Sequence, residues 1–289
     1  MKILVLGISG MLGHIMFKKL FEQKWSIYGT LRNKDLLKYF SVKHHANILK
    51  LDKFDDKKLE NIFNKIKPDI LFNCIGIVKQ RNISHEPYNS IFYNAILPHK
   101  LYELCDIYNC RLIHFSTDCV FSGKVGMYRE DNISDATELY GRTKFLGEVH
   151  NKKAITLRTS FIGHEIENSF GLLEWFLKQE KICHGFTKAI YSGLSTTEIS
   201  RIVIEYVIPR TELSGIYNLS SEPITKYDLL NIFKKVYNKD IDIIKSEKII
   251  IDRSLDSNLF KSETGYTSPK WEYMVKNMFK DRKLSFVQK

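Results

Sequence analysis

The amino-acid sequence predicts an α/β protein built around an open, doubly wound parallel sheet. Two observations carry this prediction. Short apolar runs alternate with amphipathic helical segments through residues 1–163, and a glycine-rich loop joins the first run to the first helix. Strands that are joined by helical crossovers run parallel, and their helices cover both faces of the sheet.

The elements are assigned from the period of their apolar residues and from the residues that bound them. Each predicted strand is a short apolar run followed by glycine or polar residues, and the strands are residues 2–6, 25–32, 49–51, 69–76, 111–118, 154–163 and 215–220. Each predicted helix has apolar residues three and four positions apart, and the helices are residues 13–22, 55–67, 96–105, 140–150, 171–179, 196–207, 226–238 and 269–279.

The strict alternation of strand and helix weakens after about residue 163. We therefore expect a Rossmann-type domain made of residues 1–163 and 192–221. Residues 164–191 and 222–289 are expected to form a smaller, discontinuous C-terminal domain. This second domain would cover the carboxyl ends of the strands, where ligands of such sheets bind, and would hold the substrate.

Composition narrows the class of partner and the compartment. The formal net charge of +11 suggests an anionic partner, but the lysines are scattered and no nucleic-acid motif accompanies them. The five cysteines include no C-x-x-C pair, which is typical of a reducing compartment and indicates neither a disulfide framework nor a metal site. No apolar stretch reaches the ~18 residues that span a bilayer. We expect a cytoplasmic protein that binds neither nucleic acid nor membrane.

The glycine loop LGISGMLG predicts a dinucleotide site. Gly7, Gly10 and Gly13 follow the first strand and open the first helix. Glycine allows the tight turn and a close approach of the backbone to a pyrophosphate, and the helix N-terminus offers free N–H groups to its charge. The residues expected at the cofactor are Gly7, Ser9, Gly10, Met11, Leu12, Arg32, Asp52, Cys74, Ile75, Gly76, Tyr140 and Lys144.

The end of the second strand favours NADPH over NADH. NAD-binding sheets usually place an acidic residue there to bind a ribose hydroxyl, whereas this chain places Arg32. A guanidinium can pair with a 2′-phosphate. Asp52, after the third strand, is interpreted either as an acceptor for the adenine amino group or as the cap of the following helix.

Tyr140 and Lys144 lie four residues apart at the start of a predicted helix, so they share one face. The ammonium and the helix dipole both favour phenolate, so we expect the pKa of Tyr140 to fall and the phenol to exchange a proton with a carbonyl oxygen. Ser116 and Thr117 end the preceding strand with hydroxyls that could bind the same oxygen.

These motifs together resemble the extended short-chain dehydrogenases/reductases, and within them the dTDP-4-dehydrorhamnose reductase group. The matching stretches are GISGMLG, FSTDCVFSG, YGRTKFLGE, LRTSFIG, SGLSTTEIS and LSSEPITKYDLL. The resemblance implies hydride transfer from the nicotinamide to C4 of a nucleotide-linked 4-keto-6-deoxy sugar. It implies that Tyr140 protonates O4, that Lys144 orients Tyr140 and the ribose, and that Thr117 polarises the carbonyl. A homodimer is expected only because dimers are common in this superfamily.

Two stretches depart from the rhamnose pattern. NCIGIVKQ follows the fourth strand, and IDRSLDS lies near the end. They resemble the branch that acts on UDP-linked 2-acetamido-2,6-dideoxy-hexos-4-uloses, so a UDP-N-acetyl sugar is preferred over a dTDP sugar. Such products would be precursors of cell-surface polysaccharides.

The substrate contacts are predicted at Lys79, Thr117, His164 and Arg253. Lys79 and Arg253 could meet the diphosphate, although they could equally be a surface lysine and a structural ion pair. His164 falls at the predicted domain boundary, where substrate would lie, but a lone histidine is more often structural.

Two other functions remain open at this point. An epimerase or 4,6-dehydratase of the same fold would share the glycine loop and the Tyr–Lys pair. A dehydratase usually has Thr-Asp-Glu where this chain has Thr117-Asp118-Cys119, and the missing carboxylate argues against water elimination. A non-catalytic NADP-binding regulatory subunit, as known for methionine adenosyltransferase, would not need the complete Thr, Tyr and Lys set.

Overall fold

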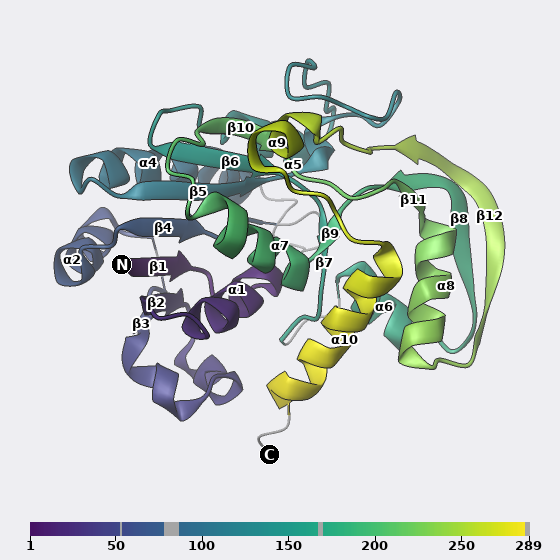
Figure 1. Cartoon of the computed structure of the whole chain (residues 1–289), viewed down its shortest axis with the longest axis horizontal. Helices are drawn as coiled ribbons and strands as arrows, with labels where there is room; N and C mark the ends of the chain where they lie inside the picture. The colour runs from purple at the N-terminus through teal and green to yellow at the C-terminus, as the bar shows by residue number, and fades with distance from the viewer. Residues whose placement is uncertain (53, 78–86, 167–169, 287–289) are drawn as a thin grey trace.

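The computed structural model describes residues 1–52, 54–77, 87–166 and 170–286 (Figure 1). Within them, seven parallel strands form a central sheet in the order β10-β6-β5-β4-β1-β2-β3. The strands are β1 (Lys2–Leu6), β2 (Ser26–Leu31), β3 (Ile48–Lys50), β4 (Ile70–Asn73), β5 (Arg111–Ser116), β6 (Ala154–Arg158) and β10 (Gly215–Asn218). The predicted α/β class and the parallel, doubly wound sheet are confirmed.

Helices cover both faces of this sheet because successive strand residues point to opposite sides. In β1, Ile3 and Val5 join the core beneath α1 (Met11–Phe21) and α7 (Thr196–Ile202), whereas Leu4 and Leu6 join a second core. The second core is built with α2 (Asp56–Ile66) and α4 (Leu97–Ile107). All four of these β1 side chains are fully buried, as expected of an apolar run in a covered parallel sheet.

The strand order reverses between β1 and β4. The chain runs outward from β1 through β2 to β3, and then returns to β4 on the other side of β1. The loops after β1 and β4 therefore leave the sheet in opposite directions, which opens a crevice at their carboxyl ends. This reversal fixes the place of the candidate site.

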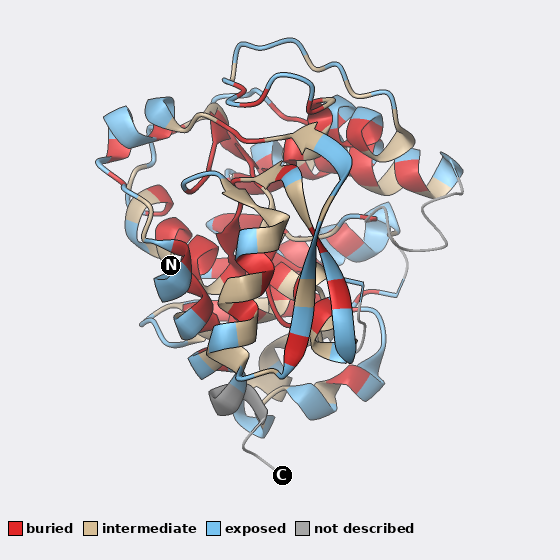
Figure 2. Cartoon of the chain, turned by 90° about the vertical axis from the view of Figure 1, so that its right-hand side faces the viewer, coloured by how far each residue is buried: buried red, intermediate tan, exposed pale blue. Residues whose placement is uncertain are grey.

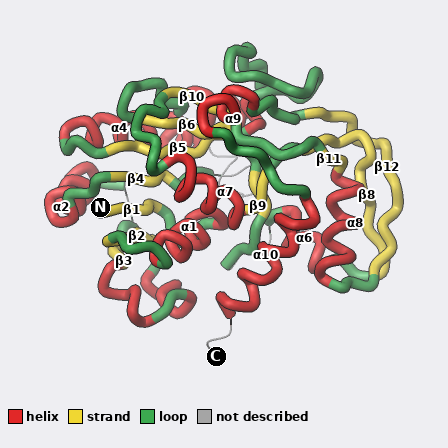
Figure 3. The backbone as a smooth tube through the Cα atoms, in the orientation of Figure 1, coloured by secondary structure: helices red, strands yellow, loops and turns green. Residues whose placement is uncertain are grey.

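A second, three-stranded sheet stands beside the central one, in the order β11-β8-β12 (Figure 3). It comprises β8 (Lys181–Tyr191), β11 (Ile224–Thr225) and β12 (Ile241–Asp252), and α8 (Lys226–Tyr237) packs against β8. Neither β8 nor β12 was predicted from the sequence. One face of β8 and β12 is exposed to solvent (Figure 2). In β8 this face carries apolar residues such as Ile182, whereas the buried face carries small residues such as Gly185 and Ala189, so the apolar residues show no clear period of two.

The remaining elements lie between or after these strands along the chain. They are α3 (Pro87–Ile91), α5 (Leu139–Leu146), β7 (Phe161–Ile162), α6 (Leu172–Lys178), β9 (Leu194–Ser195), α9 (Asn258–Thr264) and α10 (Trp271–Phe286), together with the 3₁₀ segments η1 (Lys34–Tyr39), η2 (Val42–Asn47) and η5 (Asp118–Val120) and the π-helical segments η4 (Phe92–Ile96) and η6 (Val203–Val207). Helix α10 contacts α8 and also α7, and α9 contacts β10. The last two helices therefore pack against the central sheet region as well as the second sheet. Among the described residues, no helix is long and apolar enough to cross a membrane.

Candidate active site

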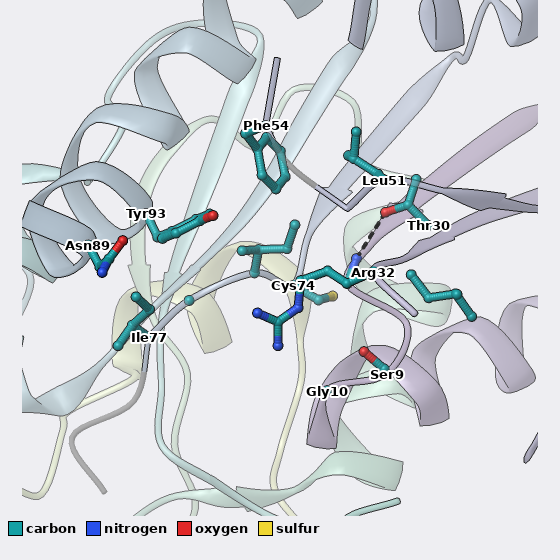
Figure 4. Close-up of a pocket in the computed structure, with 14 residues that line it drawn as sticks. Ser9, Gly10, Thr30, Arg32, Leu51, Phe54, Cys74, Ile77, Asn89 and Tyr93 are labelled. Carbon is teal, nitrogen blue, oxygen red and sulfur yellow. Dashed lines mark hydrogen bonds between the residues drawn. The ribbon is translucent and has the colours of Figure 1, made fainter. Parts of the chain in front are cut away.

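A pocket occupies the crevice at the carboxyl ends of β1, β2, β3 and β4 (Figure 4). Many of the residues predicted to contact the cofactor line it. The predicted residues in its wall are Gly7, Ser9, Gly10, Arg32, Cys74, Ile75 and Gly76. The pocket thus unites segments that are more than sixty positions apart in the sequence.

The glycine loop has the backbone geometry that a bound pyrophosphate requires. Gly7 has a φ of +78°, in the left-handed region that favours glycine. A Cβ on Gly13 would lie only 2.2 Å from the carbonyl oxygen of Gly7, so the helix could not approach the loop with any side chain there. Gly10 caps α1, which places the backbone N–H groups of Met11 and Leu12 in its first turn. The loop therefore fits a dinucleotide, with Met11 and Leu12 offering backbone rather than side-chain groups.

Arg32 follows the last residue of β2 and is exposed at the pocket. Figure 4 shows its guanidinium extending across the pocket, opposite the glycine loop. Within the described part of the chain, no carboxylate pairs with this guanidinium. A cation of this kind, without a protein counter-ion, is suited to a phosphate group.

Asp52 is not the cap of α2, and its interpretation as an acceptor for the adenine amino group stays a prediction. Its carboxylate pairs with Lys50 at 3.3 Å and with Lys58 at 2.9 Å. The cap of α2 is Asp55, whose side chain accepts a hydrogen bond from the backbone N–H of Lys58. The neighbouring Leu51 lines the pocket instead.

Two aromatic residues that the sequence analysis did not single out also line the pocket. Phe54 comes after β3 and Tyr93 lies in η4, and their rings meet edge to face with centroids 5.8 Å apart. Phe54 lies just beyond the carboxyl end of a strand, and this position could have indicated from the sequence that it lines the pocket. Tyr93 lies well after its strand, so only the fold brings it here. Together they give the pocket an apolar aromatic wall suited to a planar base.

Tyr140, Thr117 and Lys144 lie near the carboxyl end of β5. This strand is the neighbour of β4, whose carboxyl end contributes to the pocket. Tyr140 is half-buried at the start of α5 and forms a hydrogen bond with Thr117. The Thr117 hydroxyl also donates to Asp118 Oδ1 at 3.1 Å and accepts from the backbone N–H of Cys119 at 3.1 Å. The structure thus brings the three predicted catalytic residues together.

The expected fall in the pKa of Tyr140 is wrong for this structure. Burial raises the pKa of Tyr140 above its usual value, the neighbouring Cys119 and Asp118 raise it further, and the hydrogen bond to Thr117 opposes the shift only in part. Desolvation of the phenolate outweighs the helix N-terminus and any nearby ammonium. The phenol is consequently protonated around neutral pH, which is the state that a proton donor requires.

Lys144 is buried, and its Nζ donates a hydrogen bond to the carbonyl oxygen of Phe115 at 2.6 Å. Burial lowers the pKa of Lys144 to about 8, while the carboxylate of Glu148, one helical turn further on, acts in the opposite direction. The ammonium is therefore held in one place, but its proton is easier to lose than that of a solvated lysine.

Ser116 has a different role from the one predicted. Its hydroxyl donates to Glu148 Oε1 at 2.7 Å, on the side of the sheet that faces α5, and does not share the carbonyl site of Thr117. Successive strand residues point to opposite faces, so only one of the two hydroxyls could enter the crevice. Glu148 also forms a bidentate pair with Arg158, whose Nε and Nη2 each lie 2.8 Å from a carboxylate oxygen.

Arg253 reaches the same region from the end of β12. Its Nε donates to the carbonyl oxygen of Phe121 at 3.0 Å, and its Nη1 lies 3.2 Å from the Cys119 sulfur. A third contact joins Nη2 to Glu138 at 3.5 Å, two residues before Tyr140. Arg253 thus lies beside the loop that follows β5, residues 117–121, which we call the catalytic loop. Much of the hydrogen-bonding capacity of its guanidinium is already used by protein groups. Burial raises the pKa of the Cys119 thiol to about 12, so this thiol is protonated near neutral pH and is unsuited to act as a nucleophile.

His164 is engaged by the protein on both ring nitrogens. Nδ1 lies 2.6 Å from Glu174 Oε1, and Nε2 lies 2.8 Å from the hydroxyl of Tyr237. The buried ring joins α6 to α8 and has no nitrogen left for a substrate, so we assign it a structural role. Lys79 lies outside the described residues.

The fold is of the Rossmann class, and the pocket has the chemistry of a dinucleotide-binding site. The family model described as "RmlD substrate binding domain" matches residues 1–284. The chain belongs to that family, and the resemblance to the dTDP-4-dehydrorhamnose reductase group is confirmed at this level.

Individual relatives agree with this family. The chain is 26% identical over 238 residues to a dTDP-4-dehydrorhamnose reductase of Aggregatibacter actinomycetemcomitans, which covers 78% of this chain and 76% of that protein. It is 23% identical over 248 residues to methionine adenosyltransferase 2 subunit beta of Xenopus laevis, covering 81% and 72%. The solved dTDP-4-dehydrorhamnose reductase of Bacillus anthracis, in complex with NADP, is 18% identical, with a TM-score of 0.79 over 97% of this chain and 99% of that chain.

Proposed function

We propose that this protein is an NADPH-dependent reductase of a nucleotide-linked 4-keto-6-deoxy sugar, and that its preferred substrate is a UDP-2-acetamido-2,6-dideoxy-hexos-4-ulose. The observation that carries the proposal is the adjacency of two groups at one edge of the sheet. The pocket that contains Arg32 has the chemistry of a site for a phosphorylated dinucleotide. Thr117, Tyr140 and Lys144 lie at the carboxyl end of β5, the strand next to β4 of that pocket.

The residues at the end of β5 would divide the work between them. The bound nicotinamide supplies the hydride. Tyr140 is protonated and donates its proton to the carbonyl oxygen as charge develops there. Thr117, which is hydrogen-bonded to Tyr140, is placed to bind the same oxygen. We assign to the ammonium of Lys144, one helical turn after Tyr140, the stabilisation of the charge left on the phenol.

The choice of NADPH is supported by the charge of the pocket. The Arg32 guanidinium has no carboxylate partner among the described residues, and a 2′-phosphate would provide one. The choice of a UDP sugar is supported by the NCIGIVKQ and IDRSLDS stretches, which depart from the rhamnose pattern. Arg253, in the second of these stretches, lies against the catalytic loop and is our candidate for a substrate diphosphate contact.

The proposal is tested by following NADPH consumption. Purified protein would be given NADPH with a UDP-linked 2-acetamido-4-keto sugar or with dTDP-4-dehydrorhamnose, in separate reactions. Stoichiometric oxidation with the UDP sugar supports the full proposal, and oxidation with the dTDP sugar alone would correct the substrate. Conversion without net NADPH consumption would indicate an epimerase. Tight NADPH binding without turnover of either sugar would favour a regulatory subunit, the role named for the methionine adenosyltransferase relative.

A further inference from the structure

The turn that follows β8 lies over the carboxyl edge of the central sheet. Ser192 accepts a backbone hydrogen bond from Ser221, just after β10, at 2.7 Å, and its hydroxyl accepts one from the N–H of Leu255 at 2.9 Å. A Cβ on Gly193 would lie 2.3 Å from the carbonyl oxygen of Ser160, just after β6. The last residue of β8, Tyr191, is thereby held next to the strand ends that carry the catalytic residues.

The hydroxyl of Tyr191 is buried and has no hydrogen-bond partner among the described residues. Its ring packs against Trp271 with centroids 5.4 Å apart, which fixes its direction. Other tyrosine hydroxyls in the fold are satisfied, such as that of Tyr217, which donates to Glu263 at 2.6 Å. Leaving a buried hydroxyl unpaired costs about 1–3 kcal/mol, so an unpaired group beside an active site indicates a partner that arrives with the ligand.

The same two residues act on the phenols of Tyr191 and Tyr140. Asp118 and Cys119 are electrostatic neighbours of both phenols, and both raise the pKa of each. The Tyr191 hydroxyl packs directly against the backbone of Gly193, since a Cβ on Gly193 would lie 2.1 Å from the phenolic oxygen. Tyr191 and Tyr140 therefore approach the Thr117–Cys119 loop from two different elements, β8 and α5.

We propose that Tyr191 is a specificity-determining residue whose hydroxyl binds a polar substituent of the sugar ring close to the ketone, either a ring hydroxyl or the acetamido group. A phenol both donates and accepts, so it can bind either one. The inference rests on the proposed function, because it names a contact to the sugar of that same site. It concerns the sugar and not the cofactor, since Tyr191 lies at the Thr117–Cys119 loop and is absent from the wall of the dinucleotide pocket.

The test is the Tyr191→Phe variant, with thermal unfolding of the ligand-free protein, NADPH binding and steady-state kinetics as three separate readouts. Removing an unpaired hydroxyl should leave Tm unchanged or raise it. Losing its bond to the sugar should lower kcat/KM for the keto sugar by about 5- to 100-fold, mainly through KM, with the Kd for NADPH unchanged. Tyr217→Phe is the matched control: it removes a satisfied hydroxyl and should lower Tm while leaving the kinetics unchanged.

The readouts separate the failure of this inference from that of the proposed function. A Tyr191→Phe variant with a lowered Tm and wild-type KM would show that the hydroxyl serves the fold, and would overturn the inference while the reductase stands. A wild-type protein that reduces no keto sugar would overturn both.

Discussion

The buried pair of Glu148 and Arg158 gives a prediction whose size follows from the structure. Their side chains are 0% and 3% exposed, and Glu148 accepts three hydrogen bonds, one from Ser116 and two from Arg158. Glu148→Gln preserves the shape but removes the charge, which leaves the guanidinium buried beside a neutral amide. Breaking one side of a buried pair costs about 3–5 kcal/mol, so we expect a loss of that order in the free energy of unfolding.

Urea unfolding of wild type and variant measures this loss, with Asp131→Asn as the control. Asp131 pairs with Arg129 at 3.1 Å, but both side chains are more than 60% exposed (62% for Arg129 and 69% for Asp131), so the control should change stability by less than about 1 kcal/mol. If Glu148→Gln cost no more than the control, the reasoning that this buried charged pair stabilises the fold would be refuted.

Three further predictions concern catalysis. Arg32→Ala should weaken NADPH binding by at least about tenfold and NADH binding little, because only NADPH carries the phosphate; equal losses in a titration of both cofactors would remove the argument for NADPH. Tyr140→Phe should lower kcat by at least about 100-fold with NADPH binding retained, and a near-normal kcat would exclude its role as proton donor. Since burial lowers the pKa of Lys144 to about 8 and the cationic form is the active one, kcat/KM should decline as pH rises through about 8. A profile that stays flat to pH 10 would contradict a catalytic ammonium at Lys144.

The sequence was sufficient to predict those parts of the site that depend on local chemistry. Gly7 and Gly13 were predicted because a turn between strand and helix demands glycine, and Arg32 because it directly ends a strand. In the structure, Gly7 and Gly13 have the positions that a dinucleotide-binding loop requires, and Arg32 lies in the wall of the same pocket. Tyr140 and Thr117 were expected together, and they share a hydrogen bond.

Properties that depend on packing could not be predicted in this way. The pKa of Tyr140 is raised because burial outweighs nearby charge, and burial is a property of the whole fold. Asp52 pairs with two lysines, and both nitrogens of His164 are bound, which no residue pattern indicates. Tyr191 was missed because it ends β8, a strand whose exposed face carries apolar residues such as Ile182, so its sequence shows no period of two.

The most direct test of the central claim is the absorbance of NADPH, followed after adding a UDP-linked 2-acetamido-2,6-dideoxy-hexos-4-ulose to the wild-type protein and to Tyr140→Phe. The account predicts that the wild type oxidises one NADPH for each keto group reduced and that the variant oxidises almost none. Undiminished absorbance with the wild type, for this sugar and for dTDP-4-dehydrorhamnose alike, would contradict it.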